Sequence, residues 1–172
     1  MNDSDTEPST PVLLDLVNSR LTLSDGVFDE LDTDHHAREW LRARGGRGTP
    51  AEIAGARRVR DVLVPFLRGE TGSDVLAPWL AGMRKSASLE EGRLVWSLDV
   101  ADELAIGARA IEEWNALQTP TGSRIRPCAN PECQHFLVDH SKANSRRWHS
   151  MESCGNRMKS RRHYAKSREL AS

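Results

Sequence analysis

The chain has 172 residues and a mass of 19.2 kDa, which is enough for one ordinary domain and a small one that needs help to fold. Its three cysteines are an odd number, and the sequence has neither an apolar signal-like start nor an apolar run of membrane-spanning length. These features argue against a disulfide-stapled secreted protein and against a membrane partner, so we expect a cytoplasmic protein.

The net charge of −1 hides a separation of the two signs along the chain. Residues 124–172 carry 11 Lys and Arg against 4 Asp and Glu, whereas the preceding residues carry 13 against 21. An acidic body joined to a basic tail is typical of a protein whose tail meets a polyanion, most often nucleic acid.

The first elements can be predicted from apolar spacing and turn signals. Residues 1–10 are polar and acidic and are expected to be disordered. A short helix is predicted over 11–19, and a hairpin over 21–31, where a Ser-Asp-Gly sequence marks the turn. Thr33 can cap a helix that ends at 44–48, where Arg-Gly-Gly-Arg-Gly predicts a loop.

The next helix has the clearest start signal of the chain. Thr49 is followed by Pro at the first helical position and by Glu three residues after the cap. This helix is expected to end near Gly69, and a second, short helix is predicted over 74–83. The alternating segment 93–99 predicts a strand that pairs with 84–89 across a Glu-Gly turn.

The second half of the chain is expected to contain a domain boundary. Asp99 is placed to cap a long helix over 100–117. Residues 119–125 are expected to be a linker, because the composition becomes polar and the charge changes sign there. The sequence therefore predicts an α+β protein: a mostly helical domain with one or two β-hairpins over 11–118, able to fold alone, and a small β-hairpin plus helix module over 126–169.

Four metal-ligand residues are grouped in the small module. Cys128-x4-Cys133 is followed, after fifteen residues, by His149-x4-Cys154. Each pair can supply two ligands from one tight turn, and the insert lets the second pair fold back onto the first. The sequence predicts one structural Zn2+ per chain, because four protein ligands close a tetrahedral site and leave no position for an activated water.

Two other histidines compete for the fourth ligand position. His135 lies only two residues after the first pair, and His140 lies where we expect the tip of the hairpin. His149 is preferred because it gives both pairs the same spacing. Between the pairs, Phe136–Val138 and Trp148 are the only large apolar residues, which suits a hairpin stapled by a metal and is too little for a free-standing core.

The segment Arg126 to Arg168 contains RPCANPEC and FLVDHSKANSRRWHSMESCGNRMKSRR and resembles the bacterial CGNR zinc-finger family. In this chain His149 stands where the family usually has a cysteine, which gives a Cys3His site. The segment 12–19 and the later Trp40-Leu41 resemble the start of the ABATE-like domain, named for stress-induced transcription regulators, that commonly precedes CGNR fingers. The resemblance implies DNA-binding transcriptional regulation.

The basic run after the second metal-ligand pair predicts a helix of a size that fits a DNA major groove. Met158, Arg162 and Ala165 share one face, which is expected to pack towards Trp148 and the hairpin. We expect contacts with duplex DNA from Arg146, Arg147, Asn156, Arg157, Lys159, Ser160, Arg161 and Arg162. Two alternatives stay open: Arg157 can instead hydrogen-bond within the finger, and the finger can bind RNA or a protein rather than a specific DNA sequence.

The domain before the linker carries three tryptophans, Trp79, Trp96 and Trp114, which are expected to lie in the core or to line a ligand pocket. The sequence contains no P-loop, dinucleotide-type glycine motif or Ser/His/Asp order, so we expect no enzyme. The interpretation is a domain that senses a small-molecule effector or mediates association into a homodimer.

Overall fold

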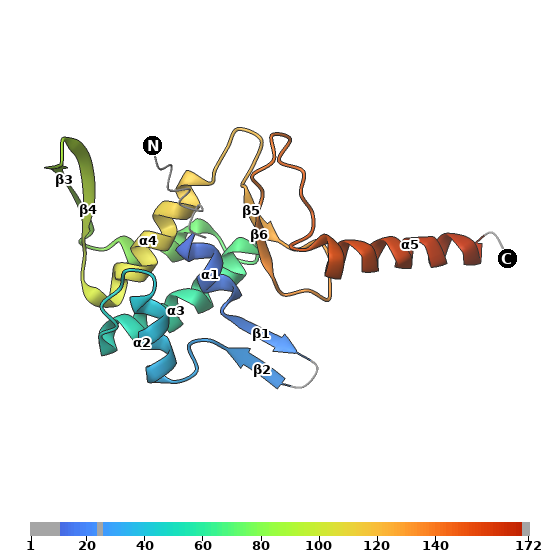
Figure 1. Cartoon of the computed structure of the whole chain (residues 1–172), viewed down its shortest axis with the longest axis horizontal. Helices are drawn as coiled ribbons and strands as arrows, with labels where there is room; N and C mark the ends of the chain where they lie inside the picture. Colours follow the sequence, from blue (N-terminus) through green and yellow to red (C-terminus); the bar gives the residue numbers. More distant parts are fainter. Residues whose placement is uncertain (1–10, 24–25, 170–172) are drawn as a thin grey trace, which may run out of the picture.

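The structure, a computed structural model, describes residues 11–23 and 26–169. The tail expected to be disordered (1–10) and the turn of the first hairpin lie outside this range. A helical body forms the centre of the molecule, with one β-hairpin standing away from it at one end and the last helix projecting at the other (Figure 1). This arrangement of helices and small antiparallel strand pairs confirms the predicted α+β class.

Helices make up most of the body. Within the described residues the α-helices are α1 (Val12–Asn18), α2 (Asp34–Arg42), α3 (Pro50–Leu67), α4 (Asp102–Ala116) and α5 (Asn156–Glu169), with a 3-10 helix η1 (Ser73–Leu80) and a short π-helix η2 (Met151–Gly155). The predicted caps are confirmed: the hydroxyls of Thr33 and Thr49 accept hydrogen bonds from the backbone N–H groups of His36 and Glu52. None of these helices is both long and apolar enough to cross a membrane.

The start of α4 differs from the prediction. Asp99 does not cap this helix, because it is the last residue of a strand and is paired with Arg84. The chain turns through the next two residues, and Ala101 occupies the cap position without a side-chain hydrogen bond. The segment expected as a helix over 74–83 is the 3-10 helix η1, which contains Pro78 and therefore lacks one backbone donor.

The strands form three separate two-stranded antiparallel sheets. They are β1 (Arg20–Leu23) with β2 (Gly26–Asp29), β3 (Arg84–Glu90) with β4 (Arg93–Asp99), and β5 (Ile125–Pro127) with β6 (Phe136–Val138). The first two hairpins were predicted. In the third, the apolar segment Phe136–Val138 pairs with Ile125–Pro127, which begins inside the expected linker 119–125, so the turn holds the first cysteine pair and the expected tip at His140 is wrong.

Close packing of α3 against α4 organises the body. A Cβ on Gly55 of α3 would overlap the carbonyl oxygen of Glu103, and a Cβ on Gly107 of α4 would lie 2.6 Å from the Trp79 ring. Glycine at both positions therefore lets the two helices and η1 approach closely. Ile53 and Ile106 belong to the buried apolar cluster that fills this region.

A buried ion pair fixes the first hairpin to α3. The Arg60 guanidinium, 4% exposed, donates to both carboxylate oxygens of Asp29 at 2.6 and 2.8 Å and to the Ser19 hydroxyl at 2.9 Å. Burial alone would raise the pKa of Asp29, but the hydrogen bonds from Arg60 and from the Leu31 N–H hold it below its usual value. The hairpin is thereby attached to the body by charge-assisted bonds as well as by its apolar residues.

The hydrophobic core continues into the C-terminal module. Ile125, Phe136 and Val138 of β5 and β6 are 3%, 1% and 3% exposed and lie in the same buried cluster as residues of α1 and α3. The Asn18 side chain accepts from the Phe136 N–H at 2.8 Å and donates to the Phe136 carbonyl at 3.2 Å. The expected boundary at 119–125 is therefore crossed by one shared core, while independent folding of 11–118 stays a prediction.

Candidate metal centre

The first cysteine pair lies in a tight turn between β5 and β6. The Cys128 N–H donates to the His135 carbonyl at 2.8 Å, and the Cys133 N–H donates to the Asn130 carbonyl at 2.9 Å. The Asn130 side chain, 1% exposed, also accepts from the Glu132 N–H at 3.3 Å. Asn-Pro at this position therefore builds the turn that the cysteine spacing requires.

The second pair is placed by the start of the C-terminal helix. Ser150 caps η2: its hydroxyl accepts from the Ser153 N–H at 3.2 Å, and its carbonyl accepts from the Cys154 N–H at 3.1 Å. Cys154 consequently lies in the first helical turn. A backbone hydrogen bond of 2.8 Å from Ala129 to Arg147 joins the two pairs.

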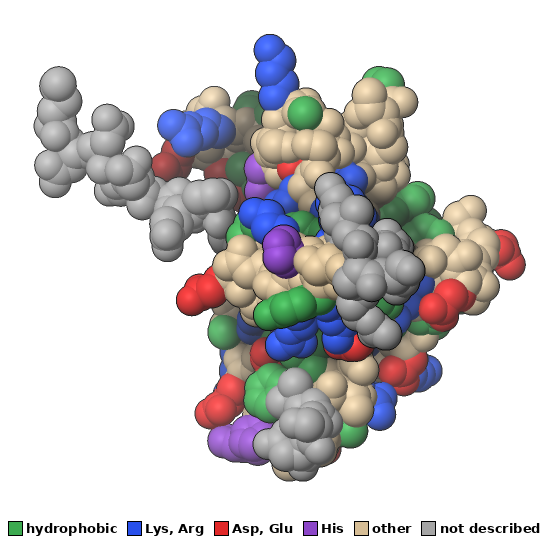
Figure 2. All heavy atoms as spheres, turned by 90° about the vertical axis from the view of Figure 1, so that its right-hand side faces the viewer, with side chains coloured by type: hydrophobic (Ala, Val, Ile, Leu, Met, Phe, Trp, Pro, Cys, Tyr) green, Lys and Arg blue, Asp and Glu red, His purple; other side chains and the backbone are tan. Residues whose placement is uncertain are grey.

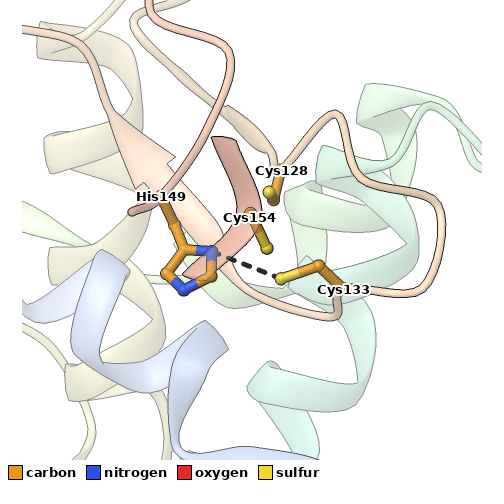
Figure 3. Close-up of side chains that lie close together, drawn as sticks. All are labelled: Cys128, Cys133, His149 and Cys154. Carbon is orange, nitrogen blue, oxygen red and sulfur yellow. Dashed lines mark hydrogen bonds between the residues drawn. The ribbon is translucent and has the colours of Figure 1, made fainter. Parts of the chain in front are cut away.

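The four predicted ligands converge on one point (Figure 3). The ligand atoms of Cys128, Cys133, His149 and Cys154 all lie within 4.8 Å of one another, and Nδ1 of His149 is 3.3 Å from Sγ of Cys133. Three sulfurs and one imidazole nitrogen in a compact group are the donor set of a tetrahedral structural zinc site. These residues form a zinc-binding group, and the predicted cofactor, Zn2+, fits the side chains present.

The thiols have an environment that suits a bound cation. Burial raises the pKa of the Cys133 thiol to about 12, so thiolates crowded here need a positive charge beside them. Burial acts in the same direction on Cys154, but the Asn130 side-chain amide, which donates to its Sγ at 3.3 Å, contributes to holding the pKa of that thiol below its usual value. Asn130 thus both forms the first turn and stabilises a ligand of the second pair.

The choice between the histidines is clear in the structure. His149 presents Nδ1 to the sulfurs while its Nε2 lies 3.4 Å from the Ser153 hydroxyl, which can orient the ring. Burial, together with the Arg146 charge, lowers the pKa of His149, which favours the neutral ring that binds a metal. His135 stacks on His149 with ring centroids 4.2 Å apart and is not one of the four converging ligands, and His140 is exposed.

A buried carboxylate supports the loop that leads to the second pair. Asp139, fully buried, accepts from the backbone N–H groups of Ser141 and Arg146 at 2.8 and 2.6 Å. The Ser141 side chain is the largest cause of the lowered pKa of Asp139, about 2; the backbone N–H groups of Arg146 and Ser141 and the nearby Arg126 charge act in the same direction, against burial. The sequence interpretation assigned no role to this residue, although Asp two positions before Ser is the spacing of an Asx turn.

The residues expected to contact DNA fall into two groups: those on α5, and Arg146 and Arg147 in the loop before η2. The described side chains of α5 are exposed except Met158, which is half-buried. The expectation that Arg162 and Ala165 pack towards the hairpin is therefore wrong: α5 projects from the module, and few apolar side chains follow Met158 to hold it there (Figure 1). Asn156 and Ser160 are exposed as well.

Three of the predicted arginines have contacts within the module. The Arg146 guanidinium donates to the carbonyls of Trp148 and His149 at 3.0 and 2.6 Å. These bonds hold the turn that carries His149 and Cys154, the second ligand turn. Arg147 lies over the Trp148 ring at 5.1 Å. Arg161 donates to both carboxylate oxygens of Glu132 at 2.7 and 2.9 Å. It is therefore paired with a residue of the turn that carries Cys128 and Cys133, the first ligand turn.

Arg157 lines a cavity of about 350 Å3 beside the metal ligands, together with Leu21 and Thr22 of β1. Among the described residues it makes no hydrogen bond or ion pair, so no contact shows it bracing the zinc site.

The three tryptophans occupy different surroundings. Trp79 is buried between α3 and α4, Trp96 is 55% exposed on β4, and Trp114 packs edge-on against Phe66 with ring centroids 5.1 Å apart. None of them lines the cavities beside the metal ligands.

Comparison with known families gives one finding. Residues 124–167 match the family model of the CGNR zinc finger. No curated protein was found to match the chain. The matched range begins one residue before β5, includes all four ligands and extends along most of α5. The C-terminal module is therefore a CGNR zinc finger.

Proposed function

We propose that this CGNR zinc finger binds duplex DNA chiefly through α5 and that the chain is a transcriptional regulator. The observation that supports the proposal most strongly is the exposure of α5, which projects from the molecule and carries solvent-exposed Arg157, Lys159, Arg161 and Arg162. In the view along this end of the molecule, Lys and Arg side chains lie in the middle of the face and also at its top and lower right, and Asp and Glu lie mainly towards its edges (Figure 2). A helix with unburied basic residues suits a DNA major groove and its phosphates.

The basic residues of α5 divide between two sides of the helix. Arg157 and Arg161, four residues apart, share the side nearest the first ligand turn, where Arg161 is paired with Glu132. Lys159 and Arg162, three residues apart, lie on another side and form no ion pair among the described residues. Lys159 and Arg162 are therefore available to phosphates at once, whereas Arg161 has to exchange its carboxylate for a phosphate or a base.

The zinc site would contribute by fixing α5 in place. A bound Zn2+ would join the first ligand turn to Cys154, which lies in the helical turn that leads directly into α5. The remaining functions are carried by the chain itself: Arg146 holds the backbone of the second turn, and Asp139 holds the loop before it. We further propose that the helical body senses an effector or mediates association.

A titration of the full chain against duplex DNA, structured RNA and heparin at several salt concentrations tests the proposal. We expect duplex DNA to be preferred and its affinity to fall steeply with salt, because each neutralised phosphate releases counterions. The plot of log affinity against log salt has a negative slope. Replacing both Lys159 and Arg162 with Ala should make this slope shallower by about 2. Arg42→Ala is the control, because Arg42 is exposed on α2, far along the chain from the finger, and the charge removed per substitution is the same.

Salt-independent binding would contradict the proposal. Unchanged affinity in the Lys159/Arg162 variant, with zinc still bound, would contradict it as well. Equal or stronger binding of structured RNA would replace duplex DNA by RNA as the partner, and loss of all polyanion preference would favour a protein partner.

A further inference from the structure

Hairpin β3–β4 exposes apolar side chains at the end of the molecule opposite α5. Every residue of β3 is exposed, and Leu89, Leu94 and Trp96 are 77%, 59% and 55% exposed. The strand register places Leu89 opposite Leu94 and Ala87 opposite Trp96, so these side chains share one face. A two-stranded hairpin alone is at best marginally stable in water, whereas three or more strands with an apolar face are stable.

The geometry of the hairpin defines which backbone groups are free. Glu91 and Gly92 form a two-residue turn with φ of 49° and 76°, as a type I′ turn requires. In such a hairpin alternate residues direct their N–H and C=O groups at the partner strand. Counting from the turn, Leu94, Trp96 and Leu98 direct theirs to the outer edge of β4, where none of the described strands pairs with them.

We propose that the outer edge of β4 pairs with β4 of a second copy of this chain, antiparallel and about a twofold axis at Trp96. In this register Trp96 lies opposite Trp96 of the second copy, and Leu94 lies opposite Leu98. The free N–H and C=O groups of Leu94, Trp96 and Leu98 can then form hydrogen bonds with those of the second copy. The result is a four-stranded sheet with a continuous apolar face, in which the two indoles and the leucines pack laterally.

The charges at the ends of β4 identify a second copy as the occupant. Arg93 and Asp99 are the first and last residues of the strand and lie at equal distances from Trp96 in sequence. Twofold pairing therefore places Arg93 of each copy opposite Asp99 of the other, in two equivalent pairs. Within the described chain neither residue takes part in an ion pair, although both are exposed.

Among the described residues, no side-chain hydrogen bond from the hairpin to the body uses the outer edge of β4, although Leu98 and Asp99 at its end line a cavity with Arg44 and Arg47. The described hydrogen bonds of the hairpin side chains to the rest of the chain come from Lys85, which donates to Glu112 of α4 at 2.8 Å and lies over the Trp96 ring at 5.7 Å. Lys85 is on β3, so the outer edge of β4 can be covered while this contact persists. The association is independent of DNA binding by the finger.

Sedimentation of the zinc-loaded full chain over a range of concentrations tests this proposal. We expect a reversible dimer, and we expect Arg93→Asp or Asp99→Arg alone to raise its Kd about tenfold, because each change places two like-charged pairs across the interface. The double variant with both changes should restore the dimer, since it exchanges the charges without separating them. Trp96→Lys should abolish dimerisation.

Zinc content and circular dichroism of each variant show whether the fold is kept, and all of these positions are exposed. A chain that is monomeric at its highest soluble concentration would overturn the proposal. So would a dimer that survives Trp96→Lys, or a double variant as weak as the single ones. Rescue by the double variant is specific, because Arg93 and Asp99 lie at opposite ends of β4 within one copy.

Discussion

The shared core predicts that a substitution in the zinc finger destabilises the helical body. Phe136 of β6 is 1% exposed, packs with residues of α1 and α3, and exchanges two hydrogen bonds with the Asn18 side chain. Phe136→Ala should leave a cavity in this core and lower the free energy of unfolding by about 3–5 kcal/mol. Phe28→Ala is the matched control, because Phe28 is 51% exposed and the same atoms are removed.

Urea unfolding followed by tryptophan fluorescence gives the measurement, since Trp40 and Trp79 are buried in the helical body. The urea midpoint of the body's unfolding transition should be lower in Phe136→Ala than in the parent chain. Phe28→Ala should lower the free energy of unfolding by less than about 1 kcal/mol. The reasoning is refuted if the two variants lower the free energy of unfolding by the same amount. It is also refuted if Phe136→Ala alters zinc binding while the fluorescence transition stays in place, because the finger would then be a separate cooperative unit.

Three further changes have defined outcomes. His149→Ala should lose stoichiometric zinc while His135→Ala keeps it, as measured by metal analysis of the purified chains. The reverse result would show that His135, and not His149, is the fourth ligand. Asp139→Asn should lower stability at neutral pH, and its difference from the parent chain should persist above a pH of about 4 and shrink as pH falls towards 2, because the pKa of this carboxylate is about 2 in the folded chain and near 3.8 unfolded. A difference that is unchanged at pH 2 would contradict this. Glu132→Gln should release Arg161 and strengthen duplex DNA binding at low salt, and weaker binding would show that the Glu132–Arg161 pair orients the helix instead.

Features set by neighbouring residues could be predicted from the sequence. Thr49 caps α3 because its hydroxyl reaches the N–H of a residue three positions on, a relation that is local by nature. The zinc-binding group was also predictable, because each ligand pair lies in one turn and the spacing of Cys128 and Cys133 repeats in His149 and Cys154. The soft ligands then limit the metal to a few choices.

Features set by contacts between distant residues could not be predicted. Strand β5 is three residues long and carries one apolar residue, Ile125, so its pairing depends on β6 and on the core beneath it. The Arg161–Glu132 pair joins positions 29 residues apart through the folded zinc module. The Arg146 guanidinium binds the carbonyls of Trp148 and His149, which are near neighbours, but this depends on the path of the folded loop; contact of Arg146 with phosphates stays a prediction.

The placement of α5 and hairpin β3–β4 at opposite ends of the molecule has a consequence for how the chain can assemble (Figure 1). A bulky partner at one projection does not occlude the other, so the two can be engaged at the same time and in either order. Loss of one projection by truncation should leave the other functional. With the two proposed contacts, DNA at α5 and a second copy at β4, a chain of this shape would be bivalent, and its two affinities could be changed by separate substitutions.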